Sequence, residues 1–256
     1  ALTPAEPSRR FPLDWIPGVY FTPRATMVKI AAQGRGVWFL PLAILTLTAI
    51  ILTVVAGPIK IREAQMKGPD LPPDFQYYSP EQQAQIMQAW EATQKPVFTY
   101  VFPGLMAVGQ VWVVWLTVSG LLHLALTMLG GRGSMGTTLN IVAWGSLPFA
   151  IRDIVRIISM LSTSQLIASP GLSGFAPPDE GRLSLFLNSL LALIDIYVIW
   201  YILLLVIGVR ASTKVSLGKA FGGVFATVLI ALALGALVNF AGSLLSNLNI
   251  VRPFFF

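Results

Sequence analysis

Residues 37–56 read VWFLPLAILTLTAIILTVVA and contain no charged side chain. A helix rises about 1.5 Å per residue, so this stretch is about 30 Å long, which is the thickness of a bilayer's hydrocarbon core. It follows a segment rich in proline and arginine and is too long for the apolar part of a signal peptide. The stretch therefore predicts a retained transmembrane helix.

Four further apolar stretches follow, at residues 98–129, 138–161, 183–209 and 221–245. Runs of this length suit helices, whereas the strands of a membrane barrel are short and alternate between apolar and polar residues. The sequence therefore predicts an all-α polytopic membrane protein. Residues 37–256 are expected to form a bundle of five transmembrane helices with short amphipathic surface helices.

The composition excludes several classes of function. Of the 256 residues, 55% are hydrophobic and 11% are charged, and the mean hydropathy is +0.73. Soluble domains carry about 25% charged residues, so a water-soluble enzyme is excluded. Cysteine is absent and there is one histidine, which excludes disulfides, thiolate-held metals and most histidine-based metal sites. We expect no enzymatic activity and no cofactor.

The distribution of lysine and arginine predicts the orientation. Nine of them flank the spans on the side of the N-terminus and six on the other side. The N-terminus is therefore predicted to be cytoplasmic and, after five spans, the C-terminus outside, in the plasma (inner) membrane. This asymmetry accounts for the net charge of +6, so no nucleic-acid partner is expected.

Residues 1–36 are predicted to be a cytoplasmic segment with one interfacial helix. Thr22 and Pro23 form a helix start, with a capping residue followed by proline at the first helical position. In the expected helix, Met27 and Ile30 share one face with Ala31. We expect this face to lie on the inner membrane surface, among the membrane lipids.

The external loop, residues 57–97, is the largest segment outside the membrane. Ser79 and Pro80 predict the start of a helix over residues 80–94. That helix places Ile86, Met87 and Trp90 on one face, and we expect this face to cover the outer end of the bundle. The alternative is contact with a partner.

Four charged residues fall inside the predicted third and fourth spans: Arg152, Asp153, Arg156 and Asp195. Arg152 and Asp195 lie at similar depths, so the two are predicted to pair. An isolated charge near the bilayer centre costs at least about 2.5 kcal/mol, so these groups need partners or water. Two interpretations stay open, a substrate or proton site facing a cavity and an ion pair that fixes the order of the helices.

Two other features resemble reactive sites. Residues 171–174 spell Gly-Leu-Ser-Gly, the GxSG of rhomboid-type proteases. The single histidine, His123, precedes Ser173 in the chain rather than following it, and Ser173 falls in an external loop rather than at the start of a span. His123 is a weak candidate for a haem or pigment ligand. Without a second histidine, a hydrogen bond between helices is the simpler interpretation.

The last predicted span contains two pairs of small residues, Gly222 with Ala226 and Ala231 with Gly235. Such pairs let membrane helices approach closely. The terminal Phe254, Phe255 and Phe256 are expected to anchor the outer interface.

The turn before the predicted third span carries a family resemblance. Residues 129–139 read LGGRGSMGTTL, followed by Val142-Ala143-Trp144 and Ser146-Leu147-Pro148. The fourth span ends in Ile207-Gly208-Val209-Arg210, and Lys219-Ala220 begins the fifth. These motifs, with Tyr20-Phe21-Thr22-Pro23-Arg24, resemble the prokaryotic branch of the YIP (Ypt-interacting protein) family.

The resemblance implies five spans, a cytoplasmic N-terminus and no catalytic residue. Eukaryotic members bind Rab-type GTPases, and some prokaryotic members accompany ABC-type exporters. We therefore expect a non-enzymatic scaffold or accessory subunit of a larger bacterial membrane assembly, most specifically an ABC-type export system, with other membrane proteins as partners. The alternative is a small permease or proton-coupled carrier that uses Arg152 and Asp195. A weaker alternative is a pigment- or haem-associated subunit.

Overall fold

A computed structural model describes residues 12–69, 71–177, 181–213 and 215–246, and the predicted anchor of Phe254, Phe255 and Phe256 lies outside these ranges. All regular structure in the described residues is helical. In chain order the helices are α1 (Trp15–Phe21), α2 (Pro23–Ala31), α3 (Phe39–Lys67), η1 (Phe75–Tyr77), α4 (Pro80–Thr93), η2 (Val97–Val101), α5 (Phe102–Met128), α6 (Met135–Gly145), α7 (Pro148–Thr163), η3 (Ser173–Phe175), α8 (Arg182–Leu191), α9 (Ile196–Ser212) and α10 (Leu217–Ser246).

Three of the predicted spans are long single helices. Residues 39–56 of the first stretch form the first part of α3, residues 98–128 of the second lie in η2 and α5, and residues 221–245 lie in α10. Each of these three helices is long and apolar enough to cross a membrane alone. Fewer than a third of the residues in the most apolar part of each are buried in the isolated chain, as expected where lipid is the neighbour.

The other two predicted spans are not continuous helices, and in this respect the prediction was wrong. Residues 138–161 are divided between α6 and α7. Pro148 lacks the amide hydrogen that would continue the hydrogen bonding of α6, and it instead starts α7. Residues 183–209 are divided between α8 and α9, which are bent by 60°. The described residues thus contain three single spanning helices, and a fourth crossing if the bent pair is one span.

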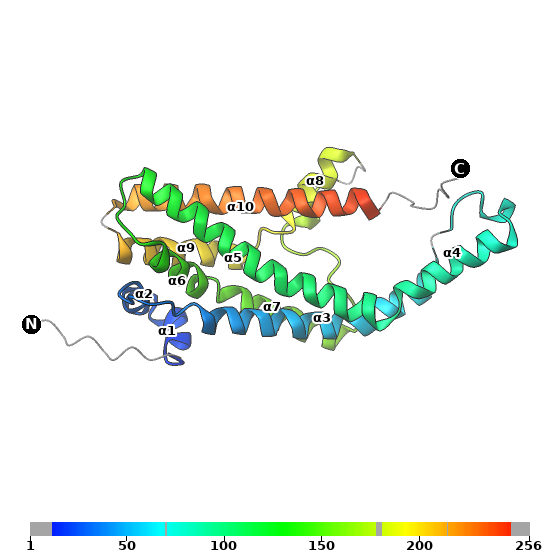
Figure 1. Ribbon diagram of the computed structural model, residues 1–256, viewed down its shortest axis with the longest axis horizontal. Helices are drawn as coiled ribbons and strands as arrows, with labels where there is room; N and C mark the ends of the chain where they lie inside the picture. The colour runs from blue at the N-terminus through cyan, green and yellow to red at the C-terminus, as the bar shows by residue number, and fades with distance from the viewer. Residues whose placement is uncertain (1–11, 70, 178–180, 214, 247–256) are drawn as a thin grey trace, which may run out of the picture.

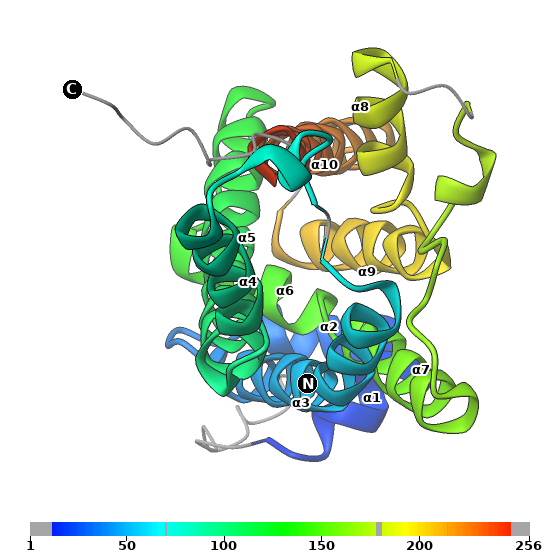
Figure 2. The ribbon, with the colours of Figure 1, turned by 90° about the vertical axis from the view of Figure 1, so that its right-hand side faces the viewer.

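The helices form an elongated bundle (Figure 1). Viewed along its length, α3, α5, α10, α9 and α7 surround α6 (Figure 2). We call the end that carries α1, α2 and the α5–α6 and α9–α10 loops the basal end. Trp144 of α6 is fully buried, as are Ile141 and Val142, so α6 lies in the core rather than facing lipid.

The helix predicted to start at Pro23 is present as α2, but protein rather than lipid covers its apolar face. Met27 and Ile30 are fully buried, and α2 packs against α6 and α9. The sequence analysis did not predict α1, whose Trp15 contacts Trp144 edge to face. The apolar face of α2 was therefore identified correctly, whereas the expectation that this face contacts membrane lipids was wrong.

The segment between α3 and α5 projects beyond the bundle at the end opposite the basal end (Figure 1). α3 has 29 residues and is therefore about 43 Å long, so about 13 Å extends past a hydrocarbon core of 30 Å. Helix α4 starts at Pro80 with a capping box formed by Ser79 and Gln82, as its sequence predicts. It has no buried residue, so the expectation that it covers the bundle was wrong. We call residues 58–96 the arm.

Candidate functional site

At the break between α8 and α9, backbone groups without a helical partner form hydrogen bonds with the Asp195 side chain and with the loop after α7. One carboxylate oxygen of Asp195 accepts hydrogen bonds from the backbone amides of Tyr197 and Val198, both at 3.0 Å. The loop after α7 reaches the same break, where the amide of Leu172 donates to the carbonyls of Leu191 (2.9 Å) and Ile194 (3.1 Å). Asp195 is thus an N-cap of α9 rather than a residue inside a continuous span.

Arg152 of α7 reaches the same place. Its Nη1 lies 3.7 Å from the second oxygen of Asp195, and its Nε lies 3.6 Å from Asp153. The guanidinium carbon also lies 4.7 Å from the centre of the Phe149 ring, a cation–π distance. The predicted contact between Arg152 and Asp195 is therefore present, at ion-pair rather than hydrogen-bond distance.

Asp153 connects this cluster to α3. Its side chain is 9% exposed and accepts a hydrogen bond from the Thr48 hydroxyl at 3.2 Å. Through Thr48, Asp153, Arg152 and Asp195, polar contacts join α3, α7 and α9. These contacts connect the α6–α7 segment to the α8–α9 segment. The carboxylates of Asp153 and Asp195 both have partners in this cluster.

Arg156 lies one turn further along α7 and is half-buried. It lines a cavity of about 220 Å³ together with Leu52 and Ala56 of α3, Met160 of α7, and Ile167 and Pro170 of the following loop. The four predicted charges are thus close in space, and Arg156 is the one that lines this cavity.

The break between α6 and α7 is supported from the N-terminal segment. The phenol of Tyr20 donates a hydrogen bond to the carbonyl of Leu147 at 2.9 Å, and the Ser146 hydroxyl donates to Val142 at 2.7 Å. Burial raises the pKa of Tyr20 to about 12, because the phenolate would lose its hydration. The N-terminal helices therefore take part in stabilising the broken third segment.

The sequence analysis missed Asn140, a fully buried residue of α6. Its side-chain oxygen accepts from the amide of Val37 (2.8 Å), and its nitrogen donates to the carbonyl of Arg35 (3.0 Å). Trp144, one turn later, donates to the carbonyl of Val37 at 3.0 Å. These bonds fix the linker before α3. Asn140 could have been identified from the sequence, because a polar amide inside an apolar run needs hydrogen-bond partners in the membrane.

Ser173 and His123 lie on different elements of the fold. The Ser173 hydroxyl donates to the carbonyl of Pro170 at 2.8 Å in the loop beside the α8–α9 break, whereas His123 lies on α5. Gly171 has φ +60, and its neighbours are the carbonyl oxygens at the end of α8. This GxSG motif is therefore a turn that closes the break. No group of three or more His, Asp or Glu residues suited to a metal occurs in the described part of the chain.

Comparison with known proteins gives one match. Neither the curated proteins nor the solved structures include a significant match to this chain. A model of the Yip1 domain family matches residues 18–238, which include every helix from α2 to α9, the charged cluster and both breaks. The chain therefore belongs to the Yip1 domain family.

Proposed function

We propose that the chain is a non-enzymatic scaffold or accessory subunit of a larger membrane assembly, and that its arm binds a partner membrane protein. The observation that carries this proposal is the projection of the arm with exposed apolar side chains. Met66 is 72% exposed and Tyr77 80%, and both lie outside the stretch of α3 and α5 that a bilayer would cover. A partner surface would bury these groups.

In this proposal the chain crosses the membrane five times, with α6–α7 and α8–α9 as broken third and fourth spans. The excess of lysine and arginine supports a basal end in the cytoplasm and an arm outside the inner membrane. The partner would therefore meet the arm on the outer side. An ABC-type export system is the assembly that the sequence resemblance favours.

Two double variants test the role of the arm. Met66→Glu with Tyr77→Glu places two charges on the exposed apolar positions, whereas Gln85→Glu with Gln88→Glu adds the same charge to exposed polar positions of α4. Tagged proteins are purified in mild detergent, and co-purifying membrane proteins are quantified by mass spectrometry. We expect a stoichiometric partner with the wild type and the control, and its loss from the first variant. A wild type that purifies alone would contradict the proposal, as would a partner that both variants retain.

The second candidate function is a proton-coupled carrier, and one arrangement favours it. Breaks in membrane helices commonly accompany binding sites in transporters, and here the α8–α9 break meets Arg152 beside the cavity that Arg156 lines. Proton flux into vesicles containing the purified protein tests this function. A carrier would lose flux in Asp195→Asn and keep it in the arm variant. A wild type without proton flux would exclude this proton-coupled function.

A further inference from the structure

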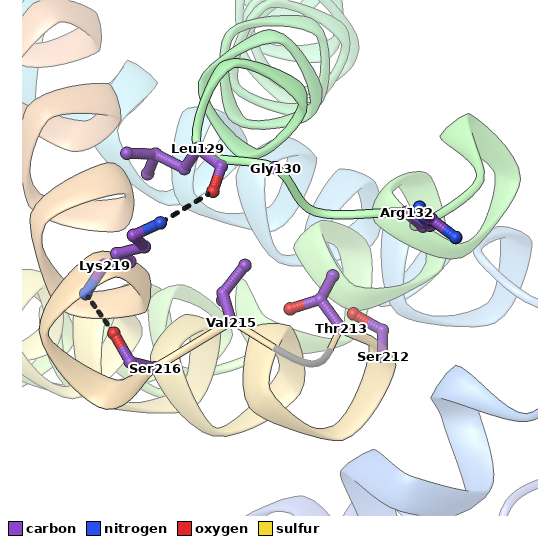
Figure 3. A pocket seen from close by; sticks show the side chains of 8 residues that line it. All are labelled: Leu129, Gly130, Arg132, Ser212, Thr213, Val215, Ser216 and Lys219. Carbon is purple, nitrogen blue, oxygen red and sulfur yellow. Dashed lines mark hydrogen bonds between the residues drawn. The ribbon is translucent and has the colours of Figure 1, made fainter.

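We propose that the basal end carries a binding site for a phosphate group. The site is a cavity of about 490 Å³ between the α5–α6 loop and the α9–α10 loop (Figure 3). Its polar lining comes from Gly130, Arg132, Ser212, Thr213, Ser216 and Lys219. This volume falls within the range of small-molecule sites in proteins, roughly 300–1,000 Å³.

The charge of the lining is uncompensated. Arg132 and Lys219 line the cavity, and none of its described lining residues is acidic. Arg132 has no hydrogen-bond or ion-pair partner within the part of the chain that the structure describes. The Lys219 ammonium donates to the carbonyl of Leu129 at 3.3 Å, which leaves two of its three hydrogens for a ligand. The two side chains lie on opposite sides of the cavity (Figure 3), and each has donors available to an anion that enters it.

The glycines at the end of α5 hold this geometry. Gly130 has φ +86, and its amide donates to Thr127 at 3.1 Å while that of Gly131 donates to Leu126 at 2.8 Å. This pair of bonds is a Schellman motif, which satisfies two of the last carbonyls of α5. The carbonyl of Leu129 remains for Lys219, so the turn positions the ammonium at the cavity (Figure 3).

The chemistry of the donors suits phosphate. Arginine presents parallel N–H groups that match two phosphate oxygens, and a lysine ammonium adds a second positive charge. The Ser216 hydroxyl accepts from the amide of Lys219 and keeps its own proton for a ligand oxygen. The hydroxyls of Ser212 and Thr213 both donate to the carbonyl of Val209, so their hydrogens are already engaged.

The phosphate has two sources, a phospholipid headgroup or a soluble phosphate compound. The surroundings favour the phospholipid, because Met128 (80% exposed), Leu217 (55%) and Phe221 (49%) lie close to the cavity residues in sequence, at the ends of α5 and α10. In a membrane these side chains would contact the acyl chains of a lipid whose headgroup occupied the cavity.

Native mass spectrometry of the full chain in detergent tests the site. Phosphatidylglycerol is titrated against the wild type, Arg132→Gln with Lys219→Gln, and a matched control, Arg24→Gln with Arg210→Gln, which removes the same charge from exposed residues outside the cavity. Arg132→Gln alone is included because it keeps the Lys219–Leu129 bond. Phosphatidylcholine is the uncharged lipid, and inorganic phosphate is titrated separately by the ³¹P NMR line width.

We expect the cavity double variant to bind phosphatidylglycerol roughly tenfold or more weakly than the wild type, with a smaller loss in Arg132→Gln and little change in the control. Binding of phosphatidylglycerol alone assigns the phosphate to a lipid. Binding of inorganic phosphate that also depends on Arg132 and Lys219 assigns it to a soluble compound. Equal weakening in both double variants, or unchanged binding in the cavity variant, would overturn the proposal.

Discussion

The Asp195 carboxylate serves two helices at once. One of its oxygens caps the first turn of α9 through the amides of Tyr197 and Val198, and the other faces the Arg152 guanidinium of α7 at 3.7 Å. The same side chain therefore starts α9 after the break in the fourth predicted span and holds α7 beside it. Because Asp195 is 12% exposed and Arg152 25%, removing either charge leaves the other poorly solvated.

The two roles of Asp195 can be separated by substitution. Asparagine still caps a helix but cannot form the ion pair, whereas alanine does neither. We expect Asp195→Asn to lower the free energy of unfolding by about 3 kcal/mol, as for other partly buried ion pairs. Asp195→Ala should cost about 1 kcal/mol more. Thermal unfolding in detergent measures both.

A double-mutant cycle with Arg152→Met serves as the control. If the ion pair accounts for the loss, the double variant Arg152→Met with Asp195→Asn will be more stable than the sum of the single losses predicts, by about 1–3 kcal/mol. Strictly additive losses would show that the two groups do not interact.

Gly171 is expected to tolerate no side chain. A Cβ there would lie 2.6 Å from the carbonyl oxygen of Ile194 and 2.8 Å from those of Ala192 and Leu191, and φ is +60. We expect Gly171→Ala to destabilise the protein by about 2 kcal/mol or more, from the left-handed conformation and the contact with rigid backbone. Gly174→Ala is the control, because its Cβ would meet only Ser169, at 3.7 Å. Equal thermal stability of the two variants would contradict the packing of this loop on the break.

Sequence patterns predicted the apolar segments and several helix ends but not the breaks. The starts at Pro23 and Pro80 were predicted because capping residues and prolines act locally. Pro148 lay inside an apolar run, where hydropathy alone does not distinguish a kink from two helices. The bend at Asp195 depends on Leu172, which is 23 positions earlier and contributes its amide rather than its side chain.

The position of the N-terminal helices could not be predicted from the neighbouring sequence either. The Met27–Ile30 face suits either a lipid surface or a protein core, because both are apolar. The surfaces that bury it belong to α6 and α9, far along the chain. The pair of Arg152 and Asp195 was predicted, since two costly charges at similar depth favour a contact.

Gly208 determines how closely α9 approaches α6. A Cβ at this position would lie 2.5 Å from Cγ2 of Ile141. We expect Gly208→Ala to cost about 1–3 kcal/mol, and Ile141→Ala in the same chain to recover part of the loss by removing the obstructing methyl group. Thermal unfolding in detergent measures both.

The contrast is Gly222 of α10, one of the small residues that the sequence analysis assigned to helix packing. A Cβ there would meet nothing within 4 Å. Gly222→Ala should therefore leave the stability unchanged or raise it by up to about 1 kcal/mol, from the better helix propensity of alanine. A loss as large as that of Gly208→Ala would mean that Gly222 contacts a further protein surface in the membrane.

Tyr20 gives the fold a dependence on alkaline pH. Its pKa is raised by burial from the ordinary value of 10.0 to about 12, so the folded state keeps the phenol protonated where the unfolded chain ionises. The stabilisation is fully present below pH 10 and is lost as the pH rises toward 12.

Tyr20→Phe tests this role of the phenol. The substitution removes the hydrogen bond to Leu147 and should cost about 1 kcal/mol at neutral pH. The protein has six tyrosines, and subtracting the phenolate absorbance titration of this variant from that of the wild type gives the titration of Tyr20 alone. A difference curve centred near pH 10 would show that the phenol is solvated, and that α1 does not support the α6–α7 break.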